Sequence, residues 1–247
     1  MAGHSHSANI AVRKGAQDKA RGKLFTKLSK EIMVAVKVGG VDPESNARLR
    51  QALSKARSNS VPKDTIKRAI DRASGNVEGA VYEDLTFEGY GLGGTAVMVD
   101  CLTDNRNRTA AEVRHAFAKT GGNLGATGCV GYMFQKKGVL FVEGGDEDEL
   151  MMLALDHGAE DVTVEEGGFE VLTEPDAFVE CNEALLEAGF MVTSGNVMQV
   201  PDTRNDIAPE NAKQFLKMLE LLDDCEDVQA VHHNGDISAE ILALVNS

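Results

Sequence analysis

The sequence predicts an α+β protein in which an N-terminal three-helix domain is followed by two α/β sandwich-type domains. Apolar residues recur at helical spacing up to Gly75, whereas after Gly79 they follow alternating and β-branched patterns interrupted by shorter helical stretches. The length of 247 residues agrees with this division, since domains of about 100 to 200 residues favour two or three units.

Three helices are expected in the first part of the chain. The stretch QDKARGKLFTKLSKEIMVAVKVGG has helical period and stops at Gly39 and Gly40. A second helix is predicted from VDPES onward, with Asp42 as N-cap and Pro43 at the first helical position. The third begins near Pro62 and ends at Gly75. Together they form a unit of roughly 60 residues with an exposed basic coat.

Strands and helices alternate in the remainder. VYEDLTFEGYGLGGTAVMVDCL predicts two strands joined by a glycine-rich hairpin, and GCVGYMF a third strand. TAAEVRHAFAKTGG predicts a helix with Thr109 and Glu112 as a capping box. From Gly138 to Val200 the order is βαββαβ, the ferredoxin-like unit.

Neither flank of the ferredoxin-like unit contains a complete sheet of its own. We therefore predict that both flanks form one discontinuous α/β domain, residues 77–135 plus 202–247, with the ferredoxin-like domain, residues 136–201, inserted into it. The basic helical domain then covers residues 1–76.

The net charge of −14 conceals a strong asymmetry. Residues 1–75 hold 16 Lys and Arg against 6 Asp and Glu, whereas the rest of the chain holds 9 basic and 33 acidic residues. A basic segment attached to acidic domains favours a local site for a polyanion, although a solvated basic surface is an equally good interpretation of the count alone.

The first helix carries the most specific basic pattern. Lys19, Lys23, Lys27, Lys30 and Lys37 fall within about 80° around the helix axis, opposite an apolar side. Such a stripe repels itself unless phosphates neutralise it. The predicted nucleic-acid contacts are Arg13, Lys14, Lys19, Arg21, Lys23, Lys27, Lys30, Lys37, Arg48, Arg57, Lys63 and Lys67.

A second basic cluster lies in DNRNRTAAEVRHAF. Helix N-terminal amides and arginines attract anions, so Arg106, Arg108 and Arg114 form a possible secondary anion site. The asparagines and Asp104 can equally bond the local backbone, with an arginine tied to neighbouring acids. We favour this structural role, because turn chemistry of this kind is the commonest use of such residues.

Several classes of function lack their motifs. The sequence contains no GxxxxGK[ST], GxSxG or HExxH, and Cys101, Cys129, Cys181 and Cys225 lack metal-ligand spacing. We expect no catalytic residues, no metal and no cofactor. There is no apolar window long enough for a membrane helix and no secretory signal at the N-terminus, so a cytoplasmic location is expected.

Longer stretches of the sequence resemble a known family. MAGHS, AQDKARGKLFTKL, VPKDTIKRAI, EGYGLGG and LTDNRNRTAAEVRHAFAKTGGNLG, in this order, resemble the YebC/PmpR family of probable transcriptional regulators. The resemblance implies one helical and two α/β domains, DNA-binding regulation in bacterial members, and action on translation in relatives that include a mitochondrial translational activator. Members typically carry Lys-Trp where this chain has His6 and Ser7.

We therefore expect a non-enzymatic nucleic-acid-binding regulator that acts on DNA. The alternatives are a ribosome-associated translation factor that binds structured RNA, and a protein-interaction scaffold that uses its acidic domains. Phosphate contacts are common to DNA and RNA, so the basic residues leave this choice open.

Overall fold

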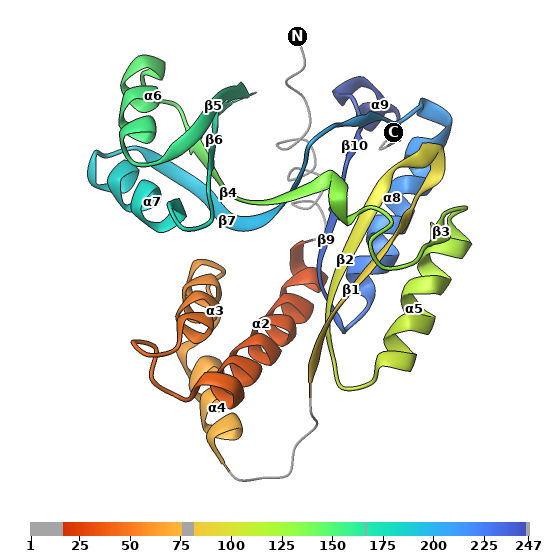
Figure 1. Ribbon diagram of the computed structural model, residues 1–247, viewed down its shortest axis with the longest axis horizontal. Coiled ribbons are helices and arrows are strands. Elements are labelled where there is room, and N and C mark those ends of the chain that lie inside the picture. Colours follow the sequence, from red (N-terminus) through yellow and green to blue (C-terminus); the bar gives the residue numbers. More distant parts are fainter. Residues whose placement is uncertain (1–16, 76–81, 166, 246–247) are drawn as a thin grey trace.

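The computed structural model describes residues 17–75, 82–165 and 167–245. The predicted α+β class is confirmed: a helical domain precedes two antiparallel four-stranded sheets, each of which carries helices on one face. Figure 1 shows the helical domain at the lower left, one sheet with its helices at the right and the other at the upper left.

The helical domain consists of α2 (Gln17–Gly39), α3 (Ala47–Ser58) and α4 (Lys63–Ser74). The apolar side of α2 packs against both shorter helices, and Leu28, Ile32, Leu49 and Leu53 are buried between them. Burial of such side chains contributes about 1.5 to 3 kcal/mol each, which makes this core the main stabilising feature of the domain.

The predicted start of α3 was wrong. Its N-cap is Asn46, whose side-chain oxygen accepts a hydrogen bond from Leu49 N–H at 3.0 Å. The Asn46 amide also donates to the carbonyl oxygens of Ala35 and Gly40, so one buried side chain closes the corner between α2 and α3. Asp42 instead accepts hydrogen bonds within the connecting turn.

The first sheet has the order β3-β1-β2-β9, built from β1 (Glu83–Tyr90), β2 (Ala96–Thr103), β3 (Asn123–Leu124) and β9 (Val228–His233). Two helices, α5 (Arg106–Lys119) and α8 (Pro209–Asp224), contribute Phe117, Phe215 and Met218 to its core. Figure 1 places both helices on the same face of the sheet. The EGYGLGG segment joins β1 to β2, as predicted, with Gly93 and Gly94 at positive φ.

The segment GCVGYMF does not form the predicted strand. Gly131–Met133 is a short 3₁₀ helix, η2, and the next strand begins only at Phe134. The buried carboxylate of Glu88 accepts hydrogen bonds from the backbone N–H groups of Gly128, Val130 and Gly131, at 2.7 to 2.8 Å. These N–H groups are therefore bound to a side chain and not to a neighbouring strand.

The second sheet has the order β5-β6-β4-β7, which is the ferredoxin-like arrangement. Its elements are β4 (Phe134–Glu143), α6 (Glu147–Asp156), β5 (Ala159–Glu165), β6 (Gly168–Thr173), α7 (Phe178–Glu187) and β7 (Met191–Pro201). Beyond it lie the short parallel pair β8 (Asn205–Asp206) and β10 (Gly235–Asp236), and α9 (Ala239–Val245). Among the described helices, none combines the length and apolar character that crossing a membrane requires.

Candidate nucleic-acid interface

The lysine stripe of α2 faces the acidic C-terminal end of α8. Lys23 Nζ lies 2.6 Å from Asp224 Oδ1, and Lys27 Nζ donates to the carbonyl oxygen of Asp223 at 3.0 Å. Lys30 Nζ lies 3.1 Å from Asp227 Oδ1. The central lysines of the predicted phosphate-binding stripe therefore already have partners, and these partners belong to another domain.

The sequence contained a signal for this contact that the prediction missed. Acids are unfavourable at a helix C-terminus, where the helix dipole is negative. The run DDCED places Asp223 and Asp224 at the end of α8 and Glu226 and Asp227 directly after it. Nearby cations stabilise carboxylates at this position, and the lysines of α2 provide them.

Asp227 is the centre of this contact. Its side chain is only 1% exposed, and Oδ2 accepts hydrogen bonds from Arg108, Thr103 and Thr109, while Oδ1 faces Lys30. Burial alone would raise the pKa of Asp227, but the hydrogen bonds from Arg108, Lys30 and Thr109 outweigh it and lower the pKa below its usual value. One ionised carboxylate thus connects α2, β2 and α5.

In the segment 104–108, Arg108 is paired with carboxylates of the protein itself. Arg108 binds both Asp227, at 2.6 Å, and Asp104, at 2.9 Å. The cap of α5 is Asn105, whose side chain accepts from Arg108 N–H, so the predicted capping box at Thr109 was wrong. Thr109 is buried in the first turn and bonds Thr103 and Asp227, because its hydroxyl faces the sheet.

Arg48, another predicted phosphate contact, is also held inside the molecule. Its guanidinium lies 2.8 Å from Glu31 and 2.8 Å from Asp84, so it connects α2 and α3 to β1. The hydrogen bonds that Arg48 donates to the carboxylates of Asp84 and Glu31 raise the pKa of Arg48 further above its ordinary value. Arg48 therefore positions the helical domain on the sheet.

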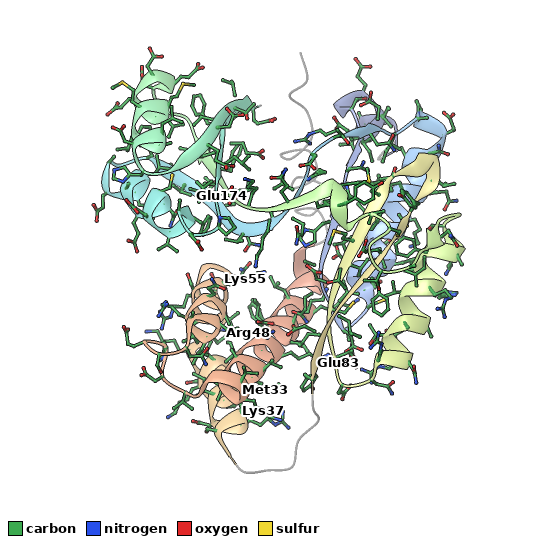
Figure 2. All side chains as sticks on the ribbon, viewed as in Figure 1. Met33, Lys37, Arg48, Lys55, Glu83 and Glu174 are labelled. Atoms are coloured by element: carbon green, nitrogen blue, oxygen red, sulfur yellow. The ribbon has the colours of Figure 1, made fainter. Side chains whose placement is uncertain are left out.

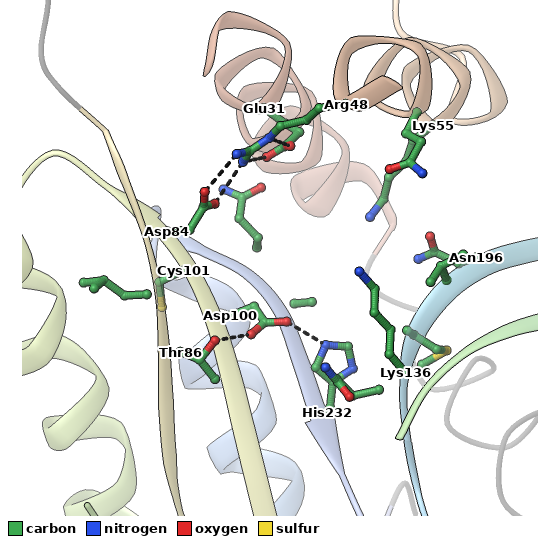
Figure 3. A pocket seen from close by; sticks show the side chains of 17 residues that line it. Glu31, Arg48, Lys55, Asp84, Thr86, Asp100, Cys101, Lys136, Asn196 and His232 are labelled. Atoms are coloured by element: carbon green, nitrogen blue, oxygen red, sulfur yellow. Dashed lines mark hydrogen bonds and ion pairs between the residues drawn. The ribbon is translucent and has the colours of Figure 1, made fainter. Parts of the chain in front are cut away.

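A polar cleft of about 470 Å³ lies beside this contact, between α2 and α3, the first sheet and the β4–β7 pair. Asp100 Oδ1 accepts from Thr86 at 2.8 Å, and Asp100 Oδ2 lies 3.1 Å from His232 Nε2. Figure 3 shows Lys55 and Lys136 reaching into the cleft from opposite walls. Its lining acids, Glu31, Asp84 and Asp100, balance its basic residues, so the cleft does not attract anions strongly.

The remaining basic surface lies on α3 and α4. Arg57, Lys63 and Lys67 are exposed, and no side-chain hydrogen bond or ion pair engages them within the described residues. At 100° per residue, Lys63 and Lys67 form one row on α4, and Arg68 and Arg72 a second row about 140° away. Asp64 and Asp71 lie between the rows, which leaves the outward face of α4 with a surplus of two positive charges.

The other predicted contacts are distributed around this surface. Lys37 is exposed near the end of α2, at the lower end of the helical domain in Figure 2, whereas Lys55 lies at its upper end. Lys19 and Arg21 belong to the first turns of α2, and Arg13 and Lys14 lie outside the described residues. Arg106 and Arg114 are exposed on α5, apart from the helical domain.

The cysteines and the acidic residues show no arrangement for metal chemistry in the described part of the chain. No group of three or more His, Cys, Asp or Glu side chains there could hold a metal ion. All four cysteines are free thiols, and burial raises the pKa of Cys101 to about 12 and that of Cys225 to about 11. These thiols stay protonated near neutral pH and are poor nucleophiles.

Comparison with known proteins gives matches along nearly the whole chain. Residues 5–76 match the TACO1/YebC protein N-terminal domain, and residues 82–235 match the TACO1/YebC second and third domain. A probable transcriptional regulatory protein of Klebsiella pneumoniae (strain 342) is 52% identical over 98% of this chain and 99% of its own length. The probable transcriptional regulatory protein YebC of Escherichia coli O6:H1 is 50% identical with the same coverage.

A solved structure is similar as well. The crystal structure of a conserved hypothetical protein from Aquifex aeolicus superimposes with a TM-score of 0.80 at 43% sequence identity. The match covers 91% of this chain and 94% of the other. The arrangement of helices and sheets described above is therefore shared with an experimentally determined structure.

Proposed function

Because the chain belongs to the TACO1/YebC family, we propose that it is a non-enzymatic regulator that binds nucleic acid through the exposed basic side chains of α3 and α4. Relatives that match 98% of the chain are named probable transcriptional regulatory proteins, which supports a role in the regulation of transcription. We propose DNA as the target and the cytoplasm as the location.

The observation that carries this proposal is the contrast between paired and unpaired basic residues. Lys23, Lys30 and Arg48 already bind carboxylates of the first α/β domain. Arg57, Lys63 and Lys67 extend into solvent without such partners. A phosphate backbone can approach only the second group without breaking contacts within the protein, and each neutralised phosphate releases counterions.

The test compares two double variants on duplex DNA over a range of salt concentrations. Lys63→Ala with Lys67→Ala is expected to reduce the slope of log affinity against log salt by about 0.9 per lost phosphate contact. Lys119→Ala with Lys213→Ala, which removes two exposed lysines outside the helical domain, should leave the slope unchanged. Equal slopes for both variants would contradict the proposed surface.

Action on RNA is the alternative outcome of the same experiment. Arg57, Lys63 and Lys67 provide phosphate contacts, which do not distinguish the two nucleic acids. Titration of duplex DNA and of a structured RNA hairpin at equal salt therefore decides between them. Tighter binding of the hairpin, lost in the Lys63 and Lys67 variant, would support a translation factor instead of a transcriptional one.

A further inference from the structure

The two helices of the ferredoxin-like domain expose apolar side chains to solvent. Met152 and Leu155 on α6 are 70% and 48% exposed, and Val179 and Leu186 on α7 are 56% and 51% exposed. Isolated exposed apolar residues are common on protein surfaces and require no explanation. Two pairs on neighbouring helices that pack against each other are a different case.

Helical geometry places these residues on one outward face. On α6, Leu150 and Ala154 point into the core, and Met152 and Leu155 lie on the opposite side of the helix. On α7, Cys181 and Leu185 are buried, and Val179 and Leu186 are likewise opposite. Because both helices pack on the same core, the four residues all lie on the solvent side of the two helices, which we name the outer helix face (Met152, Leu155, Val179 and Leu186).

The charge around the outer helix face has one sign only. Residues 138–203 contain no Lys or Arg, although they include acids throughout. On the two helices, exposed carboxylates border the apolar side chains at Asp148, Asp156, Glu180, Glu183 and Glu187. His157 is the C-cap of α6, and its Nδ1 atom lies 3.5 Å from Oε1 of Glu180.

From this arrangement we propose that the outer helix face is a docking site for a cationic amphipathic helix of a partner protein. An apolar stripe of the partner covers Met152, Leu155, Val179 and Leu186, and its Lys and Arg side chains pair with the surrounding carboxylates. This site is separate from the proposed nucleic-acid surface, so the protein can bind both at once.

Charge decides against two other occupants. A second copy of the chain would bring the same acidic helices together, and like charges that approach across an interface oppose association. Nucleic acid would be repelled for the same reason. A partner helix with basic residues beside an apolar stripe is the occupant that satisfies both the apolar surface and the carboxylates.

The experiment uses the full chain and synthetic peptides as probes. One peptide of about 18 residues has Leu at helical i, i+3, i+4 and i+7 positions and Lys elsewhere, which gives five helical turns with one apolar stripe. A second peptide has the same composition in scrambled order. Affinities are measured by fluorescence anisotropy for the natural protein, for Met152→Ser with Leu186→Ser, and for Val38→Ser with Val41→Ser.

Val38 and Val41 are exposed apolar residues of the helical domain and provide the matched control. The amphipathic peptide is expected to bind at least tenfold more tightly than the scrambled one. Met152→Ser with Leu186→Ser should weaken binding of the amphipathic peptide at least tenfold. The control variant should bind this peptide like the natural protein, and both variants should bind duplex DNA with unchanged affinity. Retained melting temperature confirms that both variants fold.

The proposal is wrong if the amphipathic peptide fails to bind, or if the Met152 and Leu186 variant binds it like the natural protein. It is also wrong if both peptides bind equally, because binding would then reflect charge alone. A dimer in sedimentation velocity that disappears in this variant would assign the outer helix face to a second copy. Duplex titration of the same samples tests the proposed function separately, so failure of one does not resemble failure of the other.

Discussion

Asp227 is the residue on which three elements depend. Its carboxylate binds Lys30 of α2, Arg108 and Thr109 of α5 and Thr103 of β2, and the side chain is almost fully buried. The carboxylate is stable there because each of its oxygens has a partner. Loss of the charge would leave Lys30 and Arg108 without their shared anion.

We predict that Asp227→Ala lowers the free energy of unfolding by about 3 kcal/mol or more, because breaking a buried ion pair leaves charges without compensation. Asp224→Ala is the control, since its pair with Lys23 is largely exposed and should contribute about 1 kcal/mol or less. Urea unfolding of both variants measures the difference. Equal midpoints would show that Asp227 is not the central residue of this contact.

Glu88 gives a prediction for acid conditions. Burial would raise its pKa, but the backbone N–H groups of Gly128, Val130 and Gly131 lower it below the ordinary value of 4.5. The native state therefore binds fewer protons than the unfolded state, so this stabilisation is present above about pH 5 and is lost as the pH falls through the folded-state pKa.

The expected result is that Glu88→Gln is less stable than the natural protein at pH 7 and loses less stability between about pH 5 and pH 3. Urea midpoints measured at half-unit pH steps give both slopes. If the two proteins lose stability in parallel below pH 5, the carboxylate of Glu88 does not contribute to the acid sensitivity.

At the scale of elements, helix α2 has an apolar side and a lysine side, and the sequence alone predicted the partner of only the first. Its apolar side, with Leu28 and Ile32, was predicted correctly because burial follows the helical period. Its lysine side was predicted to bind phosphate, yet Lys23, Lys27 and Lys30 contact residues about 200 positions further along the chain. A basic stripe has the same pattern whether its partner is a phosphate or a distant carboxylate.

Elements that depend on local sequence patterns were predicted correctly, and elements that depend on distant partners were not. The βαββαβ order follows from alternating patterns and turn residues that act locally, and the sheet order β5-β6-β4-β7 matches it. The start of α3 and the GCVGYMF segment were predicted wrongly because long-range hydrogen bonds of Asn46 and Glu88 decide them. Local propensity contains no information about such partners.

We predict that changing Lys23, Lys27 and Lys30 together to Ala loosens the contact between α2 and α8. The free energy of unfolding should fall by about 2 kcal/mol, since exposed pairs contribute up to about 1 kcal/mol each and the Lys30 pair is more buried. Faster amide hydrogen exchange in Asp223–Asp227 would locate the effect.

The slope of log affinity for duplex DNA against log salt gives a second test of the same triple variant. If the three lysines act only within the protein, their loss should change the slope far less than the loss of Lys63 and Lys67 does. A large decrease of the slope with unchanged hydrogen exchange would show instead that the lysines of α2 bind phosphate in solution.

At the scale of the whole molecule, the helical domain is attached to the first sheet mainly by charged groups. The contact includes Lys23 with Asp224, Lys30 with Asp227 and Arg48 with Asp84. The ferredoxin-like domain is connected differently, since β4 and β7 form a continuous antiparallel pair and Phe134 at its base packs with Ala96 and Met98. The two attachments should therefore respond differently to salt.

We predict that raising the salt concentration from about 0.1 M to 1 M increases the radius of gyration by separating the helical domain, because the screening length falls from about 10 Å to about 3 Å. Small-angle X-ray scattering measures this change. Asp84→Asn with Asp224→Asn removes the two more exposed pairs and leaves the buried pair of Lys30 with Asp227 in place, so the expansion should begin at a lower salt concentration than in the natural protein. An unchanged radius in both experiments would mean that apolar contacts hold the domain.

The discontinuous sheet also sets an order of events during synthesis. Strand β9 pairs with β2, with Val97 opposite His233, so the sheet and the acidic end of α8 are completed only when almost the whole chain exists. At about 5 to 20 residues per second, the ribosome makes α2 on the order of ten seconds or more before Asp223–Asp227. During that interval the lysines of α2 are not covered by the end of α8, and the nascent chain holds them close to ribosomal RNA.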